Sequence, residues 1–536
     1  MSALTRLFTL LLWFAPVPAM LPAARQLLQF YQLSSYQAGG YLRALRRLPV
    51  KAFWPGLALC ACSLLFQFLA SLCLSWLPAL AVLALLLFSA LILLSGFVIG
   101  MAAYRVKKAK TPLVKTPRVR RLAVALLLVG FLVCLALLRL LPAMGLSALV
   151  PALLPLWLLL AALLMWPAEK AVQSAYRKDA RDILETAKKG GLTAIGVTGS
   201  YGKTTVKSIL AAMLSQKAPT LASPASFNTP MGLSRCIREE LGQQHLFFIA
   251  EMGARHPQDI RVLCRFIRPA AGILASIGPQ HLETMGTIQR VRDTKFDLIR
   301  SLPEDGFAVF GDDGKFTTEC YEQAQVGKAL AGGPGSDAWA EEMELTPEGA
   351  RFTLCLKTGE RIFCQTRLVG EHNVKNILIA ALMARHFGVS PDQIQRAVEE
   401  VSPPPSRLQT SVHAAGFKVI NNGFNSSPDS SRKALEVLSA HPGRRIVVTP
   451  GFIELGRQEE ASNRRLGNDI AAAAQEAVLI GEKRTRPIRE GLLESGMPPE
   501  SIHAFPTLEI ADRFIREAYG PGDVVLYEND LPDHYA

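Results

Sequence analysis

The sequence predicts an α-helical transmembrane region followed by two α/β domains. Three observations lead to this fold class. The first 168 residues are largely apolar and contain none of the chain's 45 acidic residues, strands alternate with helices after residue 191, and three consecutive prolines interrupt this alternation at residues 403–405. We therefore expect a transmembrane region of about five helices, a charged helical linker, a central α/β domain and a C-terminal α/β domain at residues 1–168, 169–190, 191–402 and 403–536.

Charge is distributed unevenly along the chain. Residues 1–168 carry 15 of the 58 lysines and arginines, whereas the rest of the chain carries 43 of them against all 45 acidic residues. The formal net charge of +13 therefore comes from the first region. A basic, acid-free and apolar segment is typical of a membrane protein whose cationic loops face an anionic leaflet. We therefore expect membrane lipid as a partner of the first region. Residues 169–536 are nearly neutral, so we do not expect the chain to bind nucleic acid.

Four apolar segments of the first region are each long enough to span a bilayer, which requires about 20 helical residues. They are Phe53–Leu74, Leu77–Ala103, Leu122–Leu141 and Leu146–Trp166. The loops 22–52 and 104–121 are rich in Arg and Lys, so the positive-inside bias places both loops, and everything after Trp166, in the cytoplasm. We thus predict a multi-pass protein of the cell membrane with cytoplasmic α/β domains.

The N-terminal stretch Leu4–Leu21 is also apolar and contains Pro16 and Pro18. We expect a first, proline-kinked membrane span here, which would make five crossings and leave the N-terminus outside. A signal peptide or a re-entrant or interfacial segment are the alternatives.

The stretch Leu192–Thr205 organises the central domain. Leu192–Val197 is predicted to be a buried strand, Thr198–Gly202 a loop of small residues and Thr204–Leu214 a helix. A glycine-rich loop between strand and helix is the frame of a phosphate-binding loop, although Val197 stands where the strict spacing has glycine. Because ATP is cytosolic, this loop argues against a cleaved signal peptide.

Backbone N–H groups at such a loop, together with the helix N-terminus, bind phosphate. We expect Lys203 to reach the terminal phosphates and the Thr204 hydroxyl to ligate Mg²⁺. The predicted ATP-binding residues of the loop are Gly199, Ser200, Gly202, Lys203, Thr204 and Thr205.

Further short strands follow in both α/β domains. In the central domain they are Leu246–Ala250 and Ile273–Ile277, with antiparallel hairpins at 341–369. In the C-terminal domain they are Phe417–Ile420, Arg445–Val448, Ala477–Ile480 and Val524–Tyr527. Ligands of parallel open sheets lie at the carboxyl ends of strands, so polar residues directly after these strands are candidates for the site.

Three such residues stand out in the central domain. Glu251 ends the strand Leu246–Ala250 and is a natural Mg²⁺ ligand, His281 follows Ile277, and Lys295 lies fourteen residues further on. Taken singly, each has a simpler explanation: a solvated carboxylate, a helix cap and a surface lysine.

Together with the phosphate-binding loop, several further motifs resemble the ATP-dependent Mur ligase family. They are Ser226-Phe-Asn-Thr-Pro-Met-Gly232, Gly370-Glu-His-Asn-Val-Lys-Asn376, the Arg407-Leu408 pair, Asn425-Ser-Ser-Pro428 and Glu454-Leu-Gly456. The last two resemble motifs of the family's D-alanyl-D-alanine-adding branch. The resemblance covers about residues 190–536 and implies a P-loop central domain and a Rossmann-like C-terminal domain.

The resemblance implies a reaction in which ATP phosphorylates a substrate carboxylate and an amine attacks the acyl phosphate, giving an amide, ADP and phosphate. Such transfer relies on metal and lysine charge around the phosphoryl group. It implies that Thr204 and Glu251 hold a first Mg²⁺ and that His281 and a carbamylated Lys295 serve a second. It further implies that Asn228 contacts the acyl phosphate, that adenine lies near Asn373 and Asn376, and that ATP is reached by Arg407 and, at the ribose, Asn422.

The chain departs from the family pattern at four places. Asn421-Asn422 stands where the family usually has two aspartates, and Asn422 can hydrogen-bond to the ribose only without charge. Phe310 replaces the usual asparagine, and Lys295 is followed by Phe-Asp instead of Gly-Glu. Membrane helices stand in place of the family's soluble N-terminal domain, which grips the UDP-linked precursor.

Our first hypothesis is a membrane-anchored amide ligase that adds an amino acid or dipeptide to a peptidoglycan precursor. The second is a related ligase acting on a lipid-linked or other polymer acceptor. An ATP-driven transporter would explain the helices and the phosphate-binding loop but not Lys295, the Asn-Thr-Pro stretch or the second α/β domain. The acceptor, the amine donor and the oligomeric state are left open.

Overall fold

The computed structural model describes residues 21–34, 36–47, 113–140, 153–224, 227–423, 427–453, 455 and 458–529. The chain forms two compact units, one up to Val172 and one over Gln173–Leu531, which we describe separately. The predicted membrane segments Phe53–Leu74 and Leu77–Ala103, and residues 4–20, lie outside the described residues.

The first unit contains the helices α3 (Leu21–Leu33), α4 (Ala38–Arg47), α7 (Pro117–Leu140) and the start of α9 (Leu154–Lys189). These helices share an apolar core that includes Leu27, Tyr41 and Leu158. Charged groups join α7 to α9, because Arg118 and Arg121 both pair with Glu169, at 3.5 and 2.7 Å.

The helix α9 bears on the membrane prediction. Among the described residues, it is the one helix that is long and apolar enough to cross a membrane by length and composition. Large apolar side chains are exposed along α7 and the first turns of α9, at Val124, Leu128, Phe131, Leu132, Leu156, Leu163, Leu164 and Trp166. The helix continues past the predicted end of the membrane region at residue 168 and through the predicted linker to Lys189, with Pro167 inside it.

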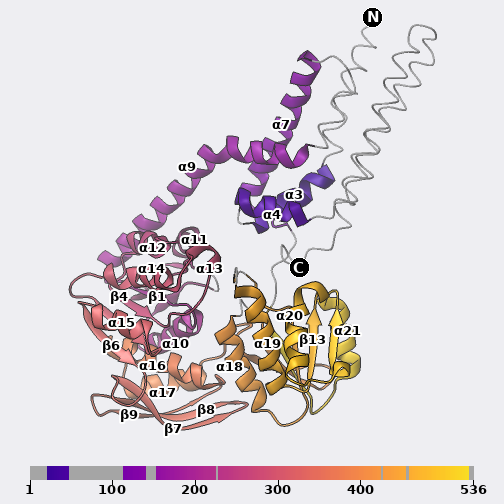
Figure 1. The fold of residues 1–536 in the computed structure, drawn as a ribbon. Helices are drawn as coiled ribbons and strands as arrows, with labels where there is room; N and C mark the ends of the chain where they lie inside the picture. The colour runs from indigo at the N-terminus through magenta and orange to yellow at the C-terminus, as the bar shows by residue number, and fades with distance from the viewer. Residues whose placement is uncertain are drawn as a thin grey trace, which may run out of the picture. The chain divides into compact units, whose positions relative to one another are not determined.

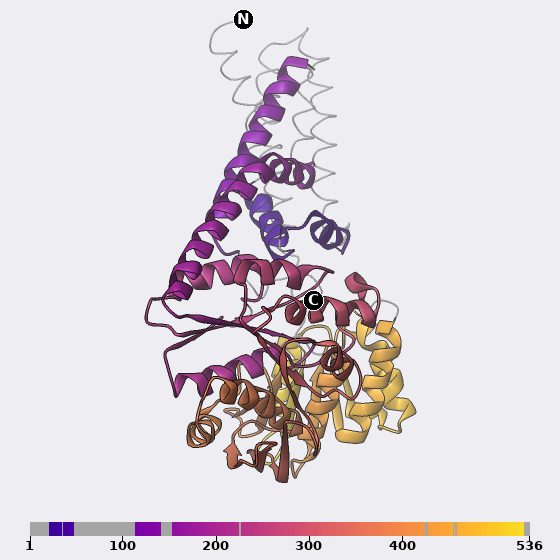
Figure 2. The same ribbon diagram turned by 90° about the vertical axis from the view of Figure 1, so that its left-hand side faces the viewer.

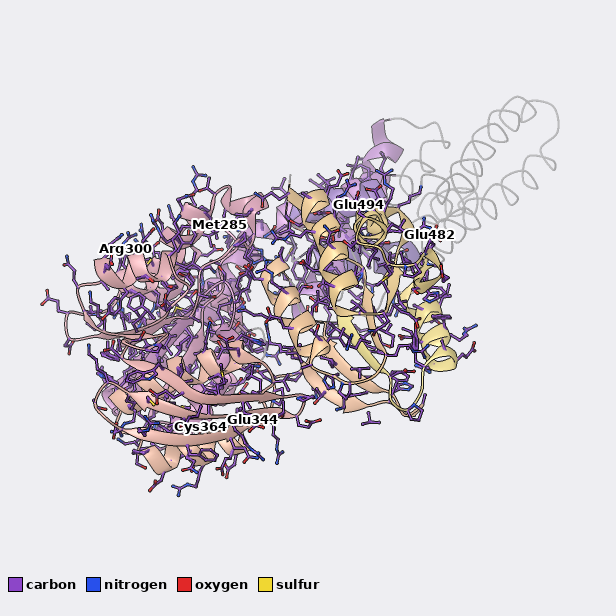
Figure 3. The ribbon with its side chains drawn as sticks, turned by 60° about the horizontal axis from the view of Figure 1, so that its bottom comes forward. Met285, Arg300, Glu344, Cys364, Glu482 and Glu494 are labelled. Atoms are coloured by element: carbon purple, nitrogen blue, oxygen red, sulfur yellow. The ribbon has the colours of Figure 1, made fainter. Side chains whose placement is uncertain are left out.

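The second unit begins with a nine-stranded sheet in the order β2-β3-β1-β4-β5-β6-β7-β8-β9. The strands from β2 to β6 are parallel, and β7, β8 and β9 form the antiparallel hairpins predicted near 341–369. Figure 3 labels Glu344 on β7 and Cys364 on β9. The strands are β1 (Thr193–Thr198), β2 (Thr220–Ala222), β3 (Phe247–Glu251), β4 (Ala271–Leu274), β5 (Phe307–Gly311), β6 (Gly327–Ala331), β7 (Ala338–Thr346), β8 (Gly349–Leu356) and β9 (Arg361–Thr366).

One predicted strand is displaced. We expected Ile273–Ile277, whereas β4 ends at Leu274. The backbone after Leu274 leaves the sheet because it bonds to the glycine-rich loop instead: the carbonyl of Ser276 accepts the N–H of Ser200 at 2.7 Å. This segment therefore supports the loop and does not extend the sheet.

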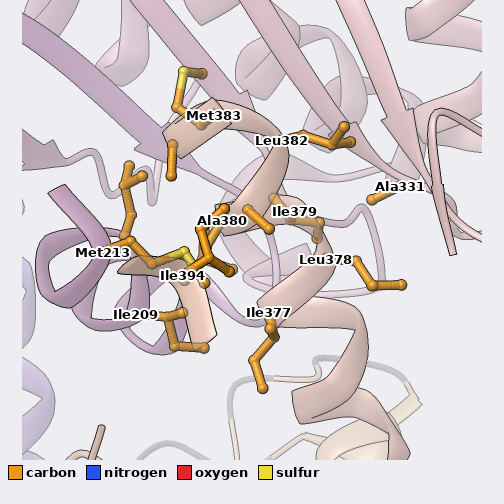
Figure 4. Close-up of a cluster of buried hydrophobic side chains, with 14 of the residues drawn as sticks. Ile209, Met213, Ala331, Ile377, Leu378, Ile379, Ala380, Leu382, Met383 and Ile394 are labelled. Carbon is orange, nitrogen blue, oxygen red and sulfur yellow. The ribbon is translucent and has the colours of Figure 1, made fainter. Parts of the chain in front are cut away.

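Helices cover both faces of this sheet (Figures 1 and 2). One face carries α10 (Lys203–Ser215), α16 (Glu371–His386) and α17 (Pro391–Glu400); the other carries the end of α9 with α11 (Pro230–Glu240), α12 (Asp259–Ile267), α13 (Leu282–Met285), α14 (Ile288–Arg300) and α15 (Phe316–Gln323). In the close-up, Ile209 and Met213 of α10 lie against Ile377 and Ala380 of α16 (Figure 4). The helix α16 is buried on nearly all sides, as expected for a helix enclosed between a sheet and two other helices.

The C-terminal domain is a second α/β layer structure with a six-stranded sheet in the order β10-β11-β15-β12-β13-β14. All neighbours are parallel except β10, which runs antiparallel to β11 at the edge. Its strands are β10 (Gln409–Val412), β11 (Lys418–Asn422), β12 (Arg445–Thr449), β13 (Glu476–Ile480), β14 (Ile502–Phe505) and β15 (Val524–Glu528). Its helices are α18 (Pro428–Ser439), α19 (Glu459–Ala473), α20 (Glu482–Glu494), the 3₁₀ turn η4 (Pro499–Ser501) and α21 (Leu508–Ala518); Figure 3 labels both ends of α20.

Candidate active site

The glycine-rich loop joins β1 to α10 and requires glycine at position 202 for steric reasons. Gly202 has a φ of 79°, and a Cβ added there would lie 2.6 Å from Oδ1 of Asn376. The helix α10 starts directly after Gly202 with no side-chain cap, so the first N–H groups of α10, from Lys203 to Thr205, have no carbonyl partner within the helix. Unpaired amides at a helix N-terminus form an anion-binding site.

Not every predicted phosphate donor of this loop is available. The Ser200 N–H is used by the Ser276 carbonyl at 2.7 Å. The Ser200 hydroxyl donates to the Gly278 carbonyl at 3.0 Å and is buried. Ser200 therefore fixes the loop against the segment after β4, and the donors that face outward belong to the start of α10.

Lys203 folds back onto its own loop. Its Nζ donates to the carbonyls of Gly199 at 2.7 Å and Ser200 at 3.0 Å. Burial lowers the pKa of Lys203 to about 8, with Glu251 opposing that shift and Arg407 adding to it. The lysine is thus a poorly solvated cation placed beside the predicted phosphate site.

Glu251 is held on both carboxylate oxygens. Its Oε2 accepts from Lys207 Nζ at 3.0 Å and its Oε1 from Asn228 Nδ2 at 3.2 Å. The side chains of Lys207 and Glu251 are only 4% and 3% exposed, which excludes the alternative of a solvated carboxylate. Burial opposes ionisation of Glu251, but the charges of Lys207 and Lys203 outweigh it and hold the pKa of Glu251 below its ordinary value.

Sequence reasoning missed Lys207. The available signal was its spacing, because residues i and i+4 of a helix lie on the same face and Lys207 follows Lys203 by four. The prediction that Asn228 and Glu251 belong to one site is consistent with their direct contact.

Lys295 lies on α14 and is buried at 2% exposure, so it is not a surface lysine. Its Nζ donates to the Gly199 carbonyl at 2.9 Å, the same carbonyl that accepts from Lys203. Burial, and secondarily the nearby Lys203 charge, hold the pKa of Lys295 well below its ordinary value. His281 lies at the N-cap of α13 with a φ of 53° and makes no side-chain cap.

Arg407 reaches the phosphate-binding loop from the segment between α17 and β10. Its Nη2 donates to the Thr204 hydroxyl at 3.3 Å. The residues on either side of it, Ser406 and Leu408, have φ values of 57° and 51°, in a region that non-glycine residues rarely adopt. Burial lowers the pKa of the Arg407 guanidinium, with Glu251 opposing. A strained segment therefore delivers this arginine to the loop.

The two predicted adenine residues lie near the loop on α16. The Oδ1 atom of Asn376 lies against Gly202, where it leaves no room for a Cβ atom. Its Nδ2 donates to Asn373 Oδ1 at 3.1 Å. Asn373 in turn donates to the Val369 carbonyl at 2.8 Å. His372 directly precedes Asn373, and desolvation lowers its pKa to about 3, with Lys433 and Lys375 adding to that shift.

Asn422 has a partner that the sequence did not reveal. Its Nδ2 donates to Glu528 Oε2 at 2.8 Å across the neighbouring strands β11 and β15, and both residues are buried. The available signal was an acidic residue at the end of the apolar strand predicted at Val524–Tyr527. Residues 226, 424–426, 454 and 456 of the predicted motifs lie outside the described residues.

A cavity of about 230 Å³ opens beside the N-terminus of α18. Two arginines and two aspartates line it, together with Pro279 from the segment after β4; they are Arg432, Arg465, Asp429 and Asp469. Charges of both signs around one small cavity suit a ligand that carries an ammonium and a carboxylate group.

The donor atoms present fit Mg²⁺. Thr204 and Glu251 offer a hydroxyl and an ionised carboxylate, which are hard oxygen ligands. Thr204 lies in the first turn of α10, and Glu251 ends β3, the parallel neighbour of β1. Within the described part of the chain, no three His, Cys, Asp or Glu side chains cluster as a complete metal site. Mg²⁺ is usually bound through one or two protein ligands plus phosphate oxygens and water.

The fold and the loop define a P-loop enzyme with a second α/β domain. Residues 197–384 match the family description "Mur ligase middle domain", and residues 406–527 match "Mur ligase, glutamate ligase domain". The chain is 30% identical over 382 residues, covering 66% of this chain and 74% of the relative, to the UDP-N-acetylmuramoyl-tripeptide--D-alanyl-D-alanine ligase of Mycobacterium tuberculosis.

Solved structures agree. MurF from Acinetobacter baumannii superposes with a TM-score of 0.60 at 27% identity, covering 68% of this chain and 78% of that one. MurF from Thermotoga maritima, in complex with ADP, shares the fold with a TM-score of 0.59 at 22% identity, covering 67% and 80%. The chain belongs to the Mur ligase family and is an ATP-dependent carboxylate–amine ligase, similar to MurF.

Proposed function

We propose that this ligase adds an amino acid or dipeptide to the peptide of a peptidoglycan precursor at the cytoplasmic face of the membrane. One observation carries the proposal: the cations of Lys203 and Lys207, the amine of Lys295 and the carboxylate of Glu251 are all brought to the phosphate-binding loop. The names of the mycobacterial relatives support the type of substrate.

The residues divide the work of phosphoryl transfer. When ATP binds, the ammonium group of Lys203 exchanges its contacts with the Gly199 and Ser200 carbonyls for the terminal phosphates. Its positive charge there stabilises the negative charge that develops in the transition state. Asn228, held by Glu251, orients the acyl phosphate, and Arg407 draws the C-terminal domain toward the nucleotide through the Thr204 side of the loop. Asn373 and Asn376 line the adenine side.

Thr204 and Glu251 would hold a first Mg²⁺, and His281 with a modified Lys295 a second. Bound Mg²⁺ supplies Lewis-acid stabilisation of the phosphoryl oxygens. Before Mg²⁺ binds, Lys207 keeps the carboxylate of Glu251 ionised and in place.

Lys295 suits carbamylation. Its low pKa makes the neutral amine available, and that amine attacks CO₂, forming a C–N bond and releasing one proton to give a carbamate anion. The adjacent Lys203 charge, which disfavours an ammonium at Lys295, favours that anion.

The amine donor would enter the cavity beside α18. Arg432 and Arg465 would bind its carboxylate, and Asp429 and Asp469 its ammonium group, with Arg432 and Asp429 exchanging their mutual contact of 3.6 Å for the ligand.

The test is ADP release and amide formation by the purified full-length protein. UDP-linked muramoyl tripeptide, a lipid-linked equivalent and a panel of other carboxylates are each offered with D-alanyl-D-alanine or single amino acids. We expect amide formation with a peptidoglycan precursor and a dipeptide or amino acid. ADP release only with unrelated carboxylates would contradict the substrate assignment.

For the N-terminal region we propose a multi-pass membrane segment that presents a membrane-associated substrate. The exposed apolar side chains of α7 and α9 and the basic loops support this. A simple anchor is the alternative. A chain starting at Gln173 separates them, because it keeps Ala180 and Leu184, which are buried in the ligase core. Selective loss of the lipid-linked reaction supports presentation, whereas equal use of soluble and lipid-linked acceptors shows an anchor.

A further inference from the structure

Asn422 and Glu528 form a buried pair at the ligand-binding edge of the C-terminal sheet. They are register partners on the parallel strands β11 and β15 and stand at the last positions of those strands. Asn422 is 9% exposed and Glu528 is 0% exposed. Ligands of such sheets bind at the carboxyl ends of strands, so Asn422 lies at the edge where a ligand would bind, with Glu528 beside it on the neighbouring strand.

The backbone of Asn422 is fixed by a separate contact. Its carbonyl accepts the N–H of Asn529 at 3.2 Å, and Asn529 Nδ2 donates to the Gly451 carbonyl at 2.7 Å. With the backbone held there, the contact with Glu528 determines how the Asn422 amide is turned.

The chemistry of the pair gives that amide one orientation. An ionised carboxylate can only accept hydrogen bonds, whereas an amide has an NH₂ group on one side and a carbonyl oxygen on the other. Glu528 Oε2 accepts from Asn422 Nδ2 at 2.8 Å, which turns Oδ1 away from Glu528. Among the described residues, none donates a hydrogen bond to this Oδ1.

We propose that Glu528 is a positioning residue that turns the carbonyl oxygen of Asn422 toward a ribose hydroxyl of bound ATP. This inference rests on the proposed function and on the role that the family resemblance implies for Asn422, which is to face the ribose. An aspartate presents an oxygen in either rotation, whereas an asparagine presents one in only one of its two rotations, which a partner on its NH₂ group selects. Glu528 therefore gives an uncharged residue the acceptor role of a carboxylate.

The experiment measures binding of ADP, 2′-deoxy-ADP and 3′-deoxy-ADP to the full-length protein by calorimetry. For the wild type we expect about fivefold weaker binding of the deoxy nucleotide that lacks the contacted hydroxyl, as one neutral hydrogen bond would give. N422A and E528Q should both lose this ratio, because the glutamine amide no longer selects one rotation of Asn422. N422D/E528Q should keep it, because a carboxylate presents an oxygen either way.

A matched control is E476Q, which changes a carboxylate at the opposite end of the same sheet that accepts from the Tyr519 hydroxyl at 2.8 Å. It should leave the ratio unchanged. A wild-type ratio in E528Q would overturn the inference and show that Glu528 only supports the fold. If thermal unfolding shows that E528Q is poorly folded, the binding ratio of N422D/E528Q is decisive. A ratio equal to that of the wild type supports the inference, and a ratio equal to that of N422A overturns it. Absence of ADP binding by the wild type would overturn the proposed function itself.

Discussion

The phosphate-binding end of the central domain and the carboxyl edge of the C-terminal sheet treat buried charge in opposite ways. The first gathers the cations of Lys203, Lys207 and Arg407 near one carboxylate, Glu251, with the amine of Lys295 on the Gly199 carbonyl of the same loop. The second buries one carboxylate, Glu528, against an amide. The first region places lysine and arginine side chains beside a carboxylate, and the second is held by a hydrogen bond between a carboxyl group and an amide.

The difference indicates how each region interacts with a ligand. Burial lowers the pKa of Lys203, Lys295 and Arg407, so an anion that arrives beside them stabilises their protonated forms. A nucleoside triphosphate is such an anion. The C-terminal edge already has its hydrogen bond, so it orients a ligand and does not attract it by charge.

The largest effect is expected at Lys203. K203A should lower the rate of ATP-dependent ligation by about 10³-fold, because it removes a donor to the transition state. The measurement is ADP release coupled to amide formation. The control is K375A, whose lysine is 57% exposed in a surface pair with Glu371 and should leave the rate unchanged. Turnover of K203A near that of the wild type would remove this lysine from the chemistry.

Lys295 should come next. K295A should lower the rate by about 10²-fold if the lysine acts as a carbamate ligand, as loss of an oriented metal ligand does. Added short carboxylates should restore part of that rate, and bicarbonate should stimulate the wild type but not the variant. K295R carries a permanent cation that cannot form the carbamate, so added carboxylates should not restore its rate. A fully active K295A that is indifferent to bicarbonate would contradict the carbamate.

The Lys207–Glu251 pair tests the charge balance of the first region through stability. K207M should lower the free energy of unfolding by about 3–5 kcal/mol, because it leaves a buried carboxylate without its cation. K207M/E251Q should recover much of this loss, since the second change removes the charge. Urea unfolding measures both. The exposed pair of Lys375 and Glu371 provides the comparison, and K375M should cost at most about 0.5 kcal/mol.

The smallest effect is a pH dependence. The pKa of Lys203 is lowered to about 8, so the free enzyme loses this positive charge as the pH rises through that value. At pH 9 about one tenth of it remains protonated, and kcat/KM for ATP should fall about tenfold relative to its plateau below pH 7. K203R keeps its charge throughout, so its lower kcat/KM should stay level over this range. A flat wild-type profile to pH 10 would contradict the shift.

The local pattern of the sequence was enough to predict the phosphate-binding loop and the end of the strand at Glu251. A buried strand, a run of small residues and an amphipathic helix follow each other directly, so periodicity alone places them. The same reasoning placed the second α/β domain and the antiparallel hairpins. It misplaced the strand after residue 270 because tertiary bonds to Ser200, and not local preference, end β4 at Leu274.

The sequence by itself therefore determined the elements and the residues that stand at their ends. Only the tertiary structure decided which of those residues meet. Glu251 pairs with Lys207 across 44 residues, Asn422 with Glu528 across 106 and Arg407 with Thr204 across 203. The physical reason is that such contacts depend on the order and register of strands, which short-range periodicity does not encode. That order brings the ends of β1 and β3 together at one site, and those of β11 and β15 at the other.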